Sequence, residues 1–239
     1  SMAQMVSNVM SQGDDENGSQ PLAEEREVKS VGLILITPDR GLTGGLNSNI
    51  LRASGDFIGE QSVPVKVVAY GKKGRDYSRR NGIEIINEFI GFGDRPSSAD
   101  TEPVSNAMMN CFENGDVDSV FVSYAKFVNT TSQRPVVDQL VPVIPVDLAT
   151  SNTGGYIFEP DANAVLSQLL PRYFQSIVHQ AILEANASEQ SARMVAMNQA
   201  TDNANAMVDD LTLVMNKLRQ ESITKELLDI VGGVSAVES

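Results

Sequence analysis

The 71 residues from Asp161 to Val231 contain no glycine and a single proline, Pro171. With 18 glycines in 239 residues, a window of this length would hold about five at average frequency. Asp161 supports a helix start, and Gly232-Gly233 favours a helix end. The sequence therefore predicts one helix over 161–231, roughly 105 Å long if continuous, in which Pro171 can break or kink the first turns.

Apolar and small side chains recur along this helix with the spacing of a coiled coil. Intervals of three and four residues alternate, which places these side chains on one seam that a second helix would cover. The seam residues are Met194, Met197, Thr201, Ala204, Val208, Leu211, Met215 and Leu218. Beyond them the register slips by one, and the stripe continues through Ile223, Leu227, Ile230 and Val234. No other segment has a helical pattern of matching length, so the partner helix is expected from a second copy, another protein or a missing N-terminal segment.

Upstream of the helix, short apolar runs alternate with amphipathic stretches. The runs at 31–37, 65–71, 83–89, 119–125 and 136–146 are expected to be strands, and 44–60, 72–81 and 98–114 helices. This alternation predicts a small α/β domain of Rossmann-like type with a mostly parallel sheet. The last two strands, joined through 129–135, can instead form an antiparallel hairpin at one edge. The strand order stays open.

The first thirty residues differ from both regions. Apolar residues at helical spacing predict the last turns of a truncated N-terminal helix: Met2, Met5, Val6, Val9 and Met10. Residues 13–30 are rich in acidic side chains and read as a solvated connector. The expected organisation is therefore a helix end and connector at 1–30, the α/β domain at 31–158 and the long coiled-coil helix at 159–239.

Composition excludes several classes of function. The formal charge of -13 argues against nucleic acid as the main partner. With one cysteine, Cys111, and one histidine, His179, the chain offers no disulfide framework, no His/Cys zinc site and almost no histidine-dependent catalysis. No run of eighteen apolar residues occurs, so no membrane span is expected.

A glycine-containing turn follows the first expected strand. Gly41, Gly44 and Gly45 could cradle a phosphate, but their spacing is neither the dinucleotide nor the Walker pattern. A tight turn is the favoured interpretation, with Asp39 and Arg40 forming an ion pair beside it. The alternative function is an α/β module that binds a small anion or nucleotide and dimerises through its helix. A homodimeric scaffold joined through 194–218 is a further alternative.

Four segments in order resemble one family, the γ subunit of F-type ATP synthases. They are TPDRGLTGGLNSNI (37–50), KFVNTTSQRPVVDQLVP (126–142), YIFEPDANAVLSQLLPRY (156–173) and ASEQSARMVAMNQATDNANAMVDDLTLVMNKLRQESITKELLDIVGG (187–233). The similarity runs from about Val31 to the C-terminus. It implies that most of the family's N-terminal helix is missing from this sequence. Because residues 147–158 are short and cysteine-free, regulation by thiols, known in photosynthetic members, is not expected.

The resemblance implies a rotor shaft without catalytic residues, cofactor or metal. In the family, a long N-terminal helix pairs with the C-terminal helix inside a ring of three α and three β subunits, and the α/β domain sits beside the ε subunit and the c-ring. Rotation of the asymmetric shaft couples ion flow to ATP synthesis or hydrolysis in the ring. The expected location is peripheral, on the cytoplasmic face of an energy-coupling plasma membrane.

The resemblance also assigns partner contacts to single residues of the long helix. Arg219 and Gln220 match the Arg-Gln pair that contacts the catch loop of the β subunit, and Thr224 lies just beyond. Ile230 and Val234 belong to the tip that turns in the apolar sleeve of the ring.

Overall fold

The computed structural model describes Leu22, residues 26–143 and residues 162–237, without the side chains of 162–163 and 231–237. The helix expected at 2–10, most of the acidic connector, and residues 144–158 lie outside these ranges. The elements in chain order are β1 (Val31–Ile36), α2 (Leu46–Glu60), β2 (Val65–Tyr70), α3 (Lys72–Arg80), β3 (Glu84–Phe89), α4 (Ser98–Glu113), β4 (Ser119–Asn129), β5 (Ser132–Val141) and α5 (Ala162–Val237).

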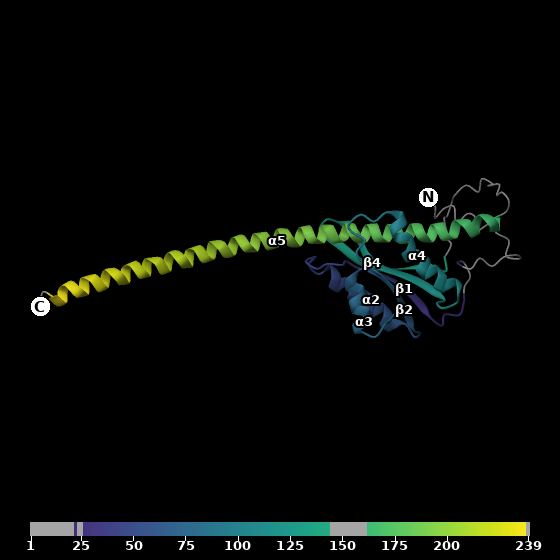
Figure 1. The fold of residues 1–239 in the computed structure, drawn as a ribbon, viewed down its shortest axis with the longest axis horizontal. Coiled ribbons are helices and arrows are strands. Elements are labelled where there is room, and N and C mark those ends of the chain that lie inside the picture. The colour runs from purple at the N-terminus through teal and green to yellow at the C-terminus, as the bar shows by residue number, and fades with distance from the viewer. Residues whose placement is uncertain (1–21, 23–25, 144–161, 238–239) are drawn as a thin grey trace. The chain divides into compact units, whose positions relative to one another are not determined.

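The five strands form one sheet in the order β3-β2-β1-β4-β5. The first four run parallel to their neighbours, and β5 pairs antiparallel with β4 at the edge. The predicted α/β fold with a mostly parallel sheet is therefore confirmed, and so is the edge hairpin. Figure 1 shows α2 and α3 on one face of the sheet, with α4 and the first part of α5 on the other.

Apolar side chains of β1 point alternately to the two faces of the sheet and pack into the core on each face. Ile34 and Ile36 join the apolar cluster beneath α4 and α5, whereas Leu33 and Leu35 join the cluster beneath α2. All four side chains are fully buried. A strand with no polar face belongs in the middle of a sheet covered on both sides, which is where β1 lies.

The first part of α5 is held by a buried stripe that packs with α4. Its members recur three or four residues apart except for one adjacent pair, Ala181 and Ile182: Leu166, Leu170, Phe174, Val178, Ala181, Ile182 and Ala185. Polar contacts add to this packing, because His179 Nδ1 lies 2.9 Å from Thr101 Oγ1 and Gln175 donates to Asn106 Oδ1 at 3.1 Å. Pro171 lies inside α5 and does not end it, since the buried stripe continues on both sides of the proline.

The predicted helix end at Gly232-Gly233 is wrong. Both glycines lie within α5, which continues to Val237. Each glycine inside a helix costs about 1 kcal/mol relative to alanine, but glycine stops a helix only when the next turn adopts a capping conformation. The backbone here continues its helical pattern instead.

The β4–β5 hairpin turns earlier than the sequence predicts. The Asn129 side chain accepts hydrogen bonds from the backbone N–H groups of Thr131 (3.0 Å) and Ser132 (2.8 Å), so the turn closes within two residues of the strand end. Pro135 therefore lies inside β5, paired with Ala125. Proline is tolerated there because β5 is an edge strand.

The chain enters β1 through two side-chain anchors. Asp118 Oδ2 accepts from the backbone N–H groups of Lys29 (2.8 Å) and Ser30 (3.0 Å). Arg26 donates to the carbonyl oxygen of Phe112 at 3.3 Å and lies over the Phe112 ring. A cation at the carbonyl end of α4 also complements the helix dipole.

The structure divides into two compact units, one ending at Arg193 and one beginning at Met194. The division falls within α5, so one helix contributes to both units. The second unit contains only helix among its described residues.

Candidate functional site

The predicted seam residues are exposed in the structure. The six large apolar members are between 38% and 61% exposed, namely Met194, Met197, Val208, Leu211, Met215 and Leu218. Thr201 and Ala204 are also exposed, as are Ile223, Leu227 and Ile230 farther along. A contiguous apolar stripe left in water is typical of an interaction surface. The candidate site is therefore this seam of α5, from Met194 to Leu218.

A second row of exposed apolar residues lies beside the seam and was missed in the sequence analysis. Met207 is 65% exposed and Val214 is 54% exposed. They form a second heptad row with Leu211 and Leu218, at intervals of four, three and four residues, so these two leucines belong to both rows. The seven-residue interval from Met207 to Val214 was the signal that could have found it.

Two rows widen the apolar surface beyond the seam of a two-stranded coil. Leu213 and Leu228 are also exposed, at 69% and 66%, and on a helix of 100° per residue they face away from the seam. A helix with apolar residues over much of its circumference is covered on more than one side in its working state.

The predicted contact residues divide between two sides of α5. Gln220 and Thr224 line the same shallow surface hollow with Lys217, since residues four apart share a face. Arg219 is absent from that lining, because adjacent helical residues project about 100° apart. It shares its side with Ile223, four residues on. The structure thus brings Gln220 and Thr224 together and separates them from Arg219.

The threonine hydroxyls of this part of α5 bond to the helix itself. The hydroxyl of Thr224 donates to the carbonyl oxygen of Gln220 at 2.9 Å. Thr201 and Thr212 make the same bond to the residue four positions earlier. Thr224 can therefore offer a partner an acceptor but not its hydroxyl proton. Ile230 is exposed, and Val234 lies within α5 with its side chain outside the described set.

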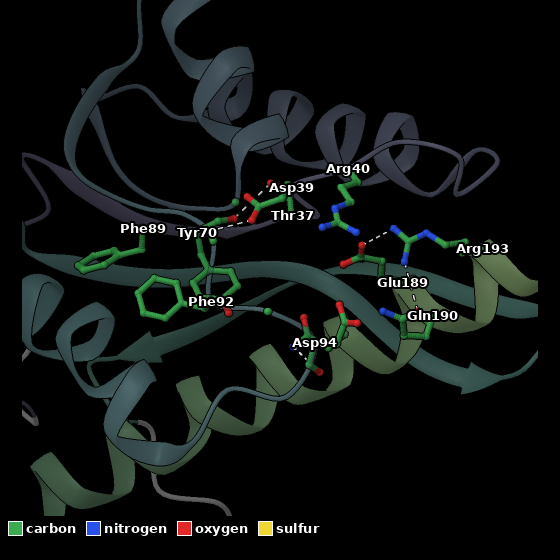
Figure 2. A pocket seen from close by; sticks show the side chains of 14 residues that line it. Thr37, Asp39, Arg40, Tyr70, Phe89, Phe92, Asp94, Glu189, Gln190 and Arg193 are labelled. Atoms are coloured by element: carbon green, nitrogen blue, oxygen red, sulfur yellow. Dashed lines mark hydrogen bonds and ion pairs between the residues drawn. The ribbon is translucent and has the colours of Figure 1, made fainter.

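A second candidate site is a polar cavity in the first unit, of about 320 Å³. It lies at the carboxyl ends of β1, β2 and β3 and is lined by residues that follow these strands and by residues 186–193 of α5. Figure 2 shows Tyr70 and Phe92 forming one wall, with ring centroids 5.6 Å apart. Ligands of parallel α/β sheets bind at this edge, so the cavity tests the alternative function.

Asp39 occupies the centre of this edge, and the predicted ion pair between Asp39 and Arg40 is wrong. One carboxylate oxygen of Asp39 accepts from the backbone N–H of Lys72 and the other from that of Gly91, both at 2.8 Å. These amides satisfy the carboxylate in place of Arg40, whose side chain is exposed. Sequence reasoning could not find them, since they are 33 and 52 residues away.

Two other charged residues that line the cavity, Arg193 and Glu189, neutralise each other. Arg193 pairs with Glu189 and also donates to Gln190, as the dashed lines in Figure 2 show. Burial raises the pKa of Tyr70 to about 12, helped by the negative charges of Asp39, Asp100 and Glu189. An anion entering near Tyr70 would meet the same unfavourable negative field.

The glycine turn does not wrap around this cavity. A Cβ built on Gly41 or Gly44 would meet nothing within 4 Å, so neither glycine is required by close approach to a neighbour. Gly44 has a φ of +56°, which is the conformation of a tight turn. Gly41, Gly44 and Gly45 are also absent from the cavity lining, which favours the turn over a phosphate cradle at this cavity.

Metal binding and membrane insertion were also considered as possible properties of the described residues. Among them, no group of three or more His, Cys, Asp or Glu side chains could hold a metal ion. No helix in the same part of the chain is long and apolar enough to cross a membrane.

The sequence of this chain is similar to those of known proteins of one family. A model of the "ATP synthase" family matches residues 1–237. The chain is 53% identical over 217 residues to the ATP synthase gamma chain of Dehalococcoides mccartyi (strain CBDB1), covering 91% of this chain and 76% of that one. It is 41% identical over 237 residues to the ATP synthase gamma chain of Moorella thermoacetica, covering 99% and 83%.

Solved structures share the fold at low sequence identity. The central stalk and c-ring structure of Tetrahymena thermophila mitochondrial ATP synthase matches with a TM-score of 0.60 and 21% identity, over 84% of each chain. The rotor of Euglena gracilis mitochondrial ATP synthase matches with a TM-score of 0.61 and 15% identity, over 92% of this chain and 88% of that one.

Proposed function

This chain belongs to the ATP synthase γ-chain family, and on that premise we propose that it acts as the central-stalk rotor. In this role, α5 turns inside a ring of three α and three β subunits and couples ion-driven rotation to ATP synthesis or hydrolysis. The chain itself supplies shape and stiffness, and the ring supplies the chemistry. No cofactor is needed for such a role.

The observation that carries this proposal is the exposed seam of α5. Val208, Leu211 and Met215 are each about 60% exposed, although burial would stabilise each by roughly 1.5 to 3 kcal/mol. A helix gains that energy only from a neighbour. A helix in the N-terminal part of the γ polypeptide is the partner proposed for the seam.

The second row supports a surrounding ring rather than one partner alone. Met207 and Val214 would stay exposed if a single helix covered only the seam. Subunits arranged around the shaft would cover them as well. In the proposed assembly, Ile230 and Val234 turn in the apolar sleeve of the ring.

Polar contacts to the ring are proposed for the two sides described above. Arg219 is exposed and carries a permanently charged, planar guanidinium group that suits carboxylate or carbonyl partners. Gln220 is also exposed and offers an amide. Because they project to different sides, we expect them to contact different parts of the β catch loop.

The first unit is proposed to form the foot of the stalk. There it would meet the ε subunit and the c-ring, and the complex would lie on the cytoplasmic face of the plasma membrane. The α/β fold gives this foot a core buried on both faces of β1, which suits a part that must resist deformation.

Charge placed on the seam tests the proposal directly. The variant Leu211→Asp should lower the yield and the coupled ATPase of a complex assembled with α and β subunits at least tenfold, because an unpaired buried carboxylate costs several kcal/mol. Gln199→Asp is the matched control, since Gln199 is exposed, faces away from both rows and lies about 21 Å along the helix from Leu213. Equal behaviour of the two variants would reject the shaft role.

The alternatives make different predictions for the chain alone. An anion-binding module would bind nucleotide in isothermal titration, and the contacts of Asp39 speak against this. A homodimeric scaffold would give a stable dimer in light scattering that Leu211→Asp dissociates. The rotor proposal expects neither tight nucleotide binding nor a stable dimer.

A further inference from the structure

The carboxyl ends of three parallel strands meet where α3 begins. In α/β proteins this edge holds the ligand, and an anion commonly sits against the N-terminal N–H groups of a helix. In this chain the group at that position is the side chain of Asp39, which comes from the segment after β1.

We infer that the Asp39 carboxylate fills, from within the chain, the position that a bound anion takes in other α/β folds. Its two oxygens accept from Lys72 N–H at the start of α3 and from Gly91 N–H after β3, both at 2.8 Å. One carboxylate thus joins the segments that follow β1, β2 and β3. This inference concerns the first unit and does not depend on the rotor proposal.

The other N–H groups at the start of α3 are also satisfied by the chain. Lys73 donates to the carbonyl oxygen of Pro38 at 3.3 Å, and Gly74 donates to Thr37 Oγ1 at 2.8 Å. Together with Lys72, these groups are the orphan donors that a phosphate would use at a helix start. None of the three is left for an external anion.

Close packing keeps the segment after β1 against α3. A Cβ on Gly71 would lie 1.8 Å from the carbonyl oxygen of Thr37, so only glycine permits this approach. Gly71 also has a φ of +93°, which side chains disfavour. The space in which a nucleotide would place its phosphate is therefore filled by Thr37, Pro38 and Asp39.

Asp39 is accordingly a positioning residue, and removing its carboxylate should open an anion site. Asp39 lines the polar cavity, so Asp39→Ala would leave a hole of about one carboxylate that solvent can reach. Formate matches the atoms that the substitution removes. Restoration by formate would show that the lost group acted as an anion against these two amides.

The test uses the 239-residue chain carrying Asp39→Ala. Its melting temperature should fall by about 5 to 10 °C, because two charge-assisted hydrogen bonds are lost. Sodium formate should restore at least half of the loss in a saturable manner, while sodium chloride at equal ionic strength should not. In amide-resolved NMR, formate should shift the Lys72 and Gly91 signals of the variant and leave those of the wild type unchanged.

Asp94→Ala is the matched control. Asp94 lines the same cavity but is exposed, so its loss should change the melting temperature little and formate should have no specific effect. Equal responses of Asp39→Ala to formate and chloride would overturn the inference. If the alanine variant does not fold, Asp39→Asn decides the question: at least one of the Lys72 and Gly91 amides should exchange tenfold faster, and unchanged protection of both would overturn it.

Discussion

Residues 164–192 and 194–230 of α5 both carry apolar side chains at helical spacing, yet their environments are opposite. In the first segment the stripe is buried, with Phe174 2% exposed and Ile182 fully buried. In the second, Leu211 and Leu218 are about 60% exposed. The sheet and α4 supply the covering surface in the first case, and no described residue supplies it in the second.

This difference teaches that one helix can belong to two cores. The stripe before Arg193 completes a core that the chain builds for itself. The stripe that begins at Met194 has the same chemistry, and we propose that other polypeptides bury it. A single periodic pattern therefore predicts burial without saying which molecule provides it.

The largest expected effect separates the two segments in the isolated chain. Phe174→Ala should lower the free energy of unfolding by about 3 to 5 kcal/mol, because it empties a packed site. Leu211→Ala should change it by at most about 0.5 kcal/mol, since the side chain is already in solvent. Denaturant titration of both variants measures this. A large loss for Leu211→Ala would mean that its stripe is covered within the isolated chain.

Two glycine substitutions compare a tightly packed position with an open position inside the first unit. Gly71→Ala should lower the free energy of unfolding by about 3 kcal/mol, because its Cβ would overlap the Thr37 carbonyl oxygen. Gly44→Ala should cost only about 1 to 2 kcal/mol, since its φ is positive but nothing lies near its Cβ. Thermal unfolding of both variants gives the order, and a reversed order would contradict the close approach after β1.

The next effect needs the assembled complex. Replacing Arg219 and Gln220 by alanine should weaken coupling between rotation and ATP turnover several-fold, a loss of about 1 kcal/mol in the interaction. The isolated chain should unfold as the wild type does, because both side chains are exposed. Single-molecule rotation with parallel ATPase assays measures the coupling. Unchanged torque and turnover would remove these residues from the contact surface.

A further effect appears in alkaline solution. The folded state raises the pKa of Tyr70 from 10.0 to about 12, so the fold favours the neutral phenol. Its contribution to stability is fully present below about pH 10 and is lost as the pH rises toward about 12. Tyr70→Phe should therefore flatten the fall of melting temperature over that window, and an unchanged slope would contradict the burial of this hydroxyl.

Local patterns were sufficient to predict most of the elements. The first three strands and helices α2, α3 and α4 lie within two residues of their predicted bounds. These segments have a clear period of two or of about 3.6 residues, and Gly, Pro or Asp residues mark their ends. The family resemblance, confirmed by the comparisons, supplied the function that no single motif carried.

One error comes from dependence on groups that are distant in the sequence, and two have local causes. Asp39 pairs with amides of Lys72 and Gly91 rather than with its neighbour Arg40, and only the folded sheet edge brings them together. Gly232-Gly233 looked like a stop because glycine permits an end, although it does not impose one. The row through Met207 and Val214 was overlooked because Leu211 and Leu218 had already been assigned to the seam.

The self-bonded threonines of the second unit have a consequence for motion. Thr201, Thr212 and Thr224 each commit the hydroxyl proton to a carbonyl of their own helix. A neighbouring subunit that moves past these threonines would therefore meet no free hydroxyl donor at the three positions. We expect the resistance to rotation at these positions to vary little with the rotation angle of α5. The positions that hold the helix at a particular angle should instead be those with free polar groups.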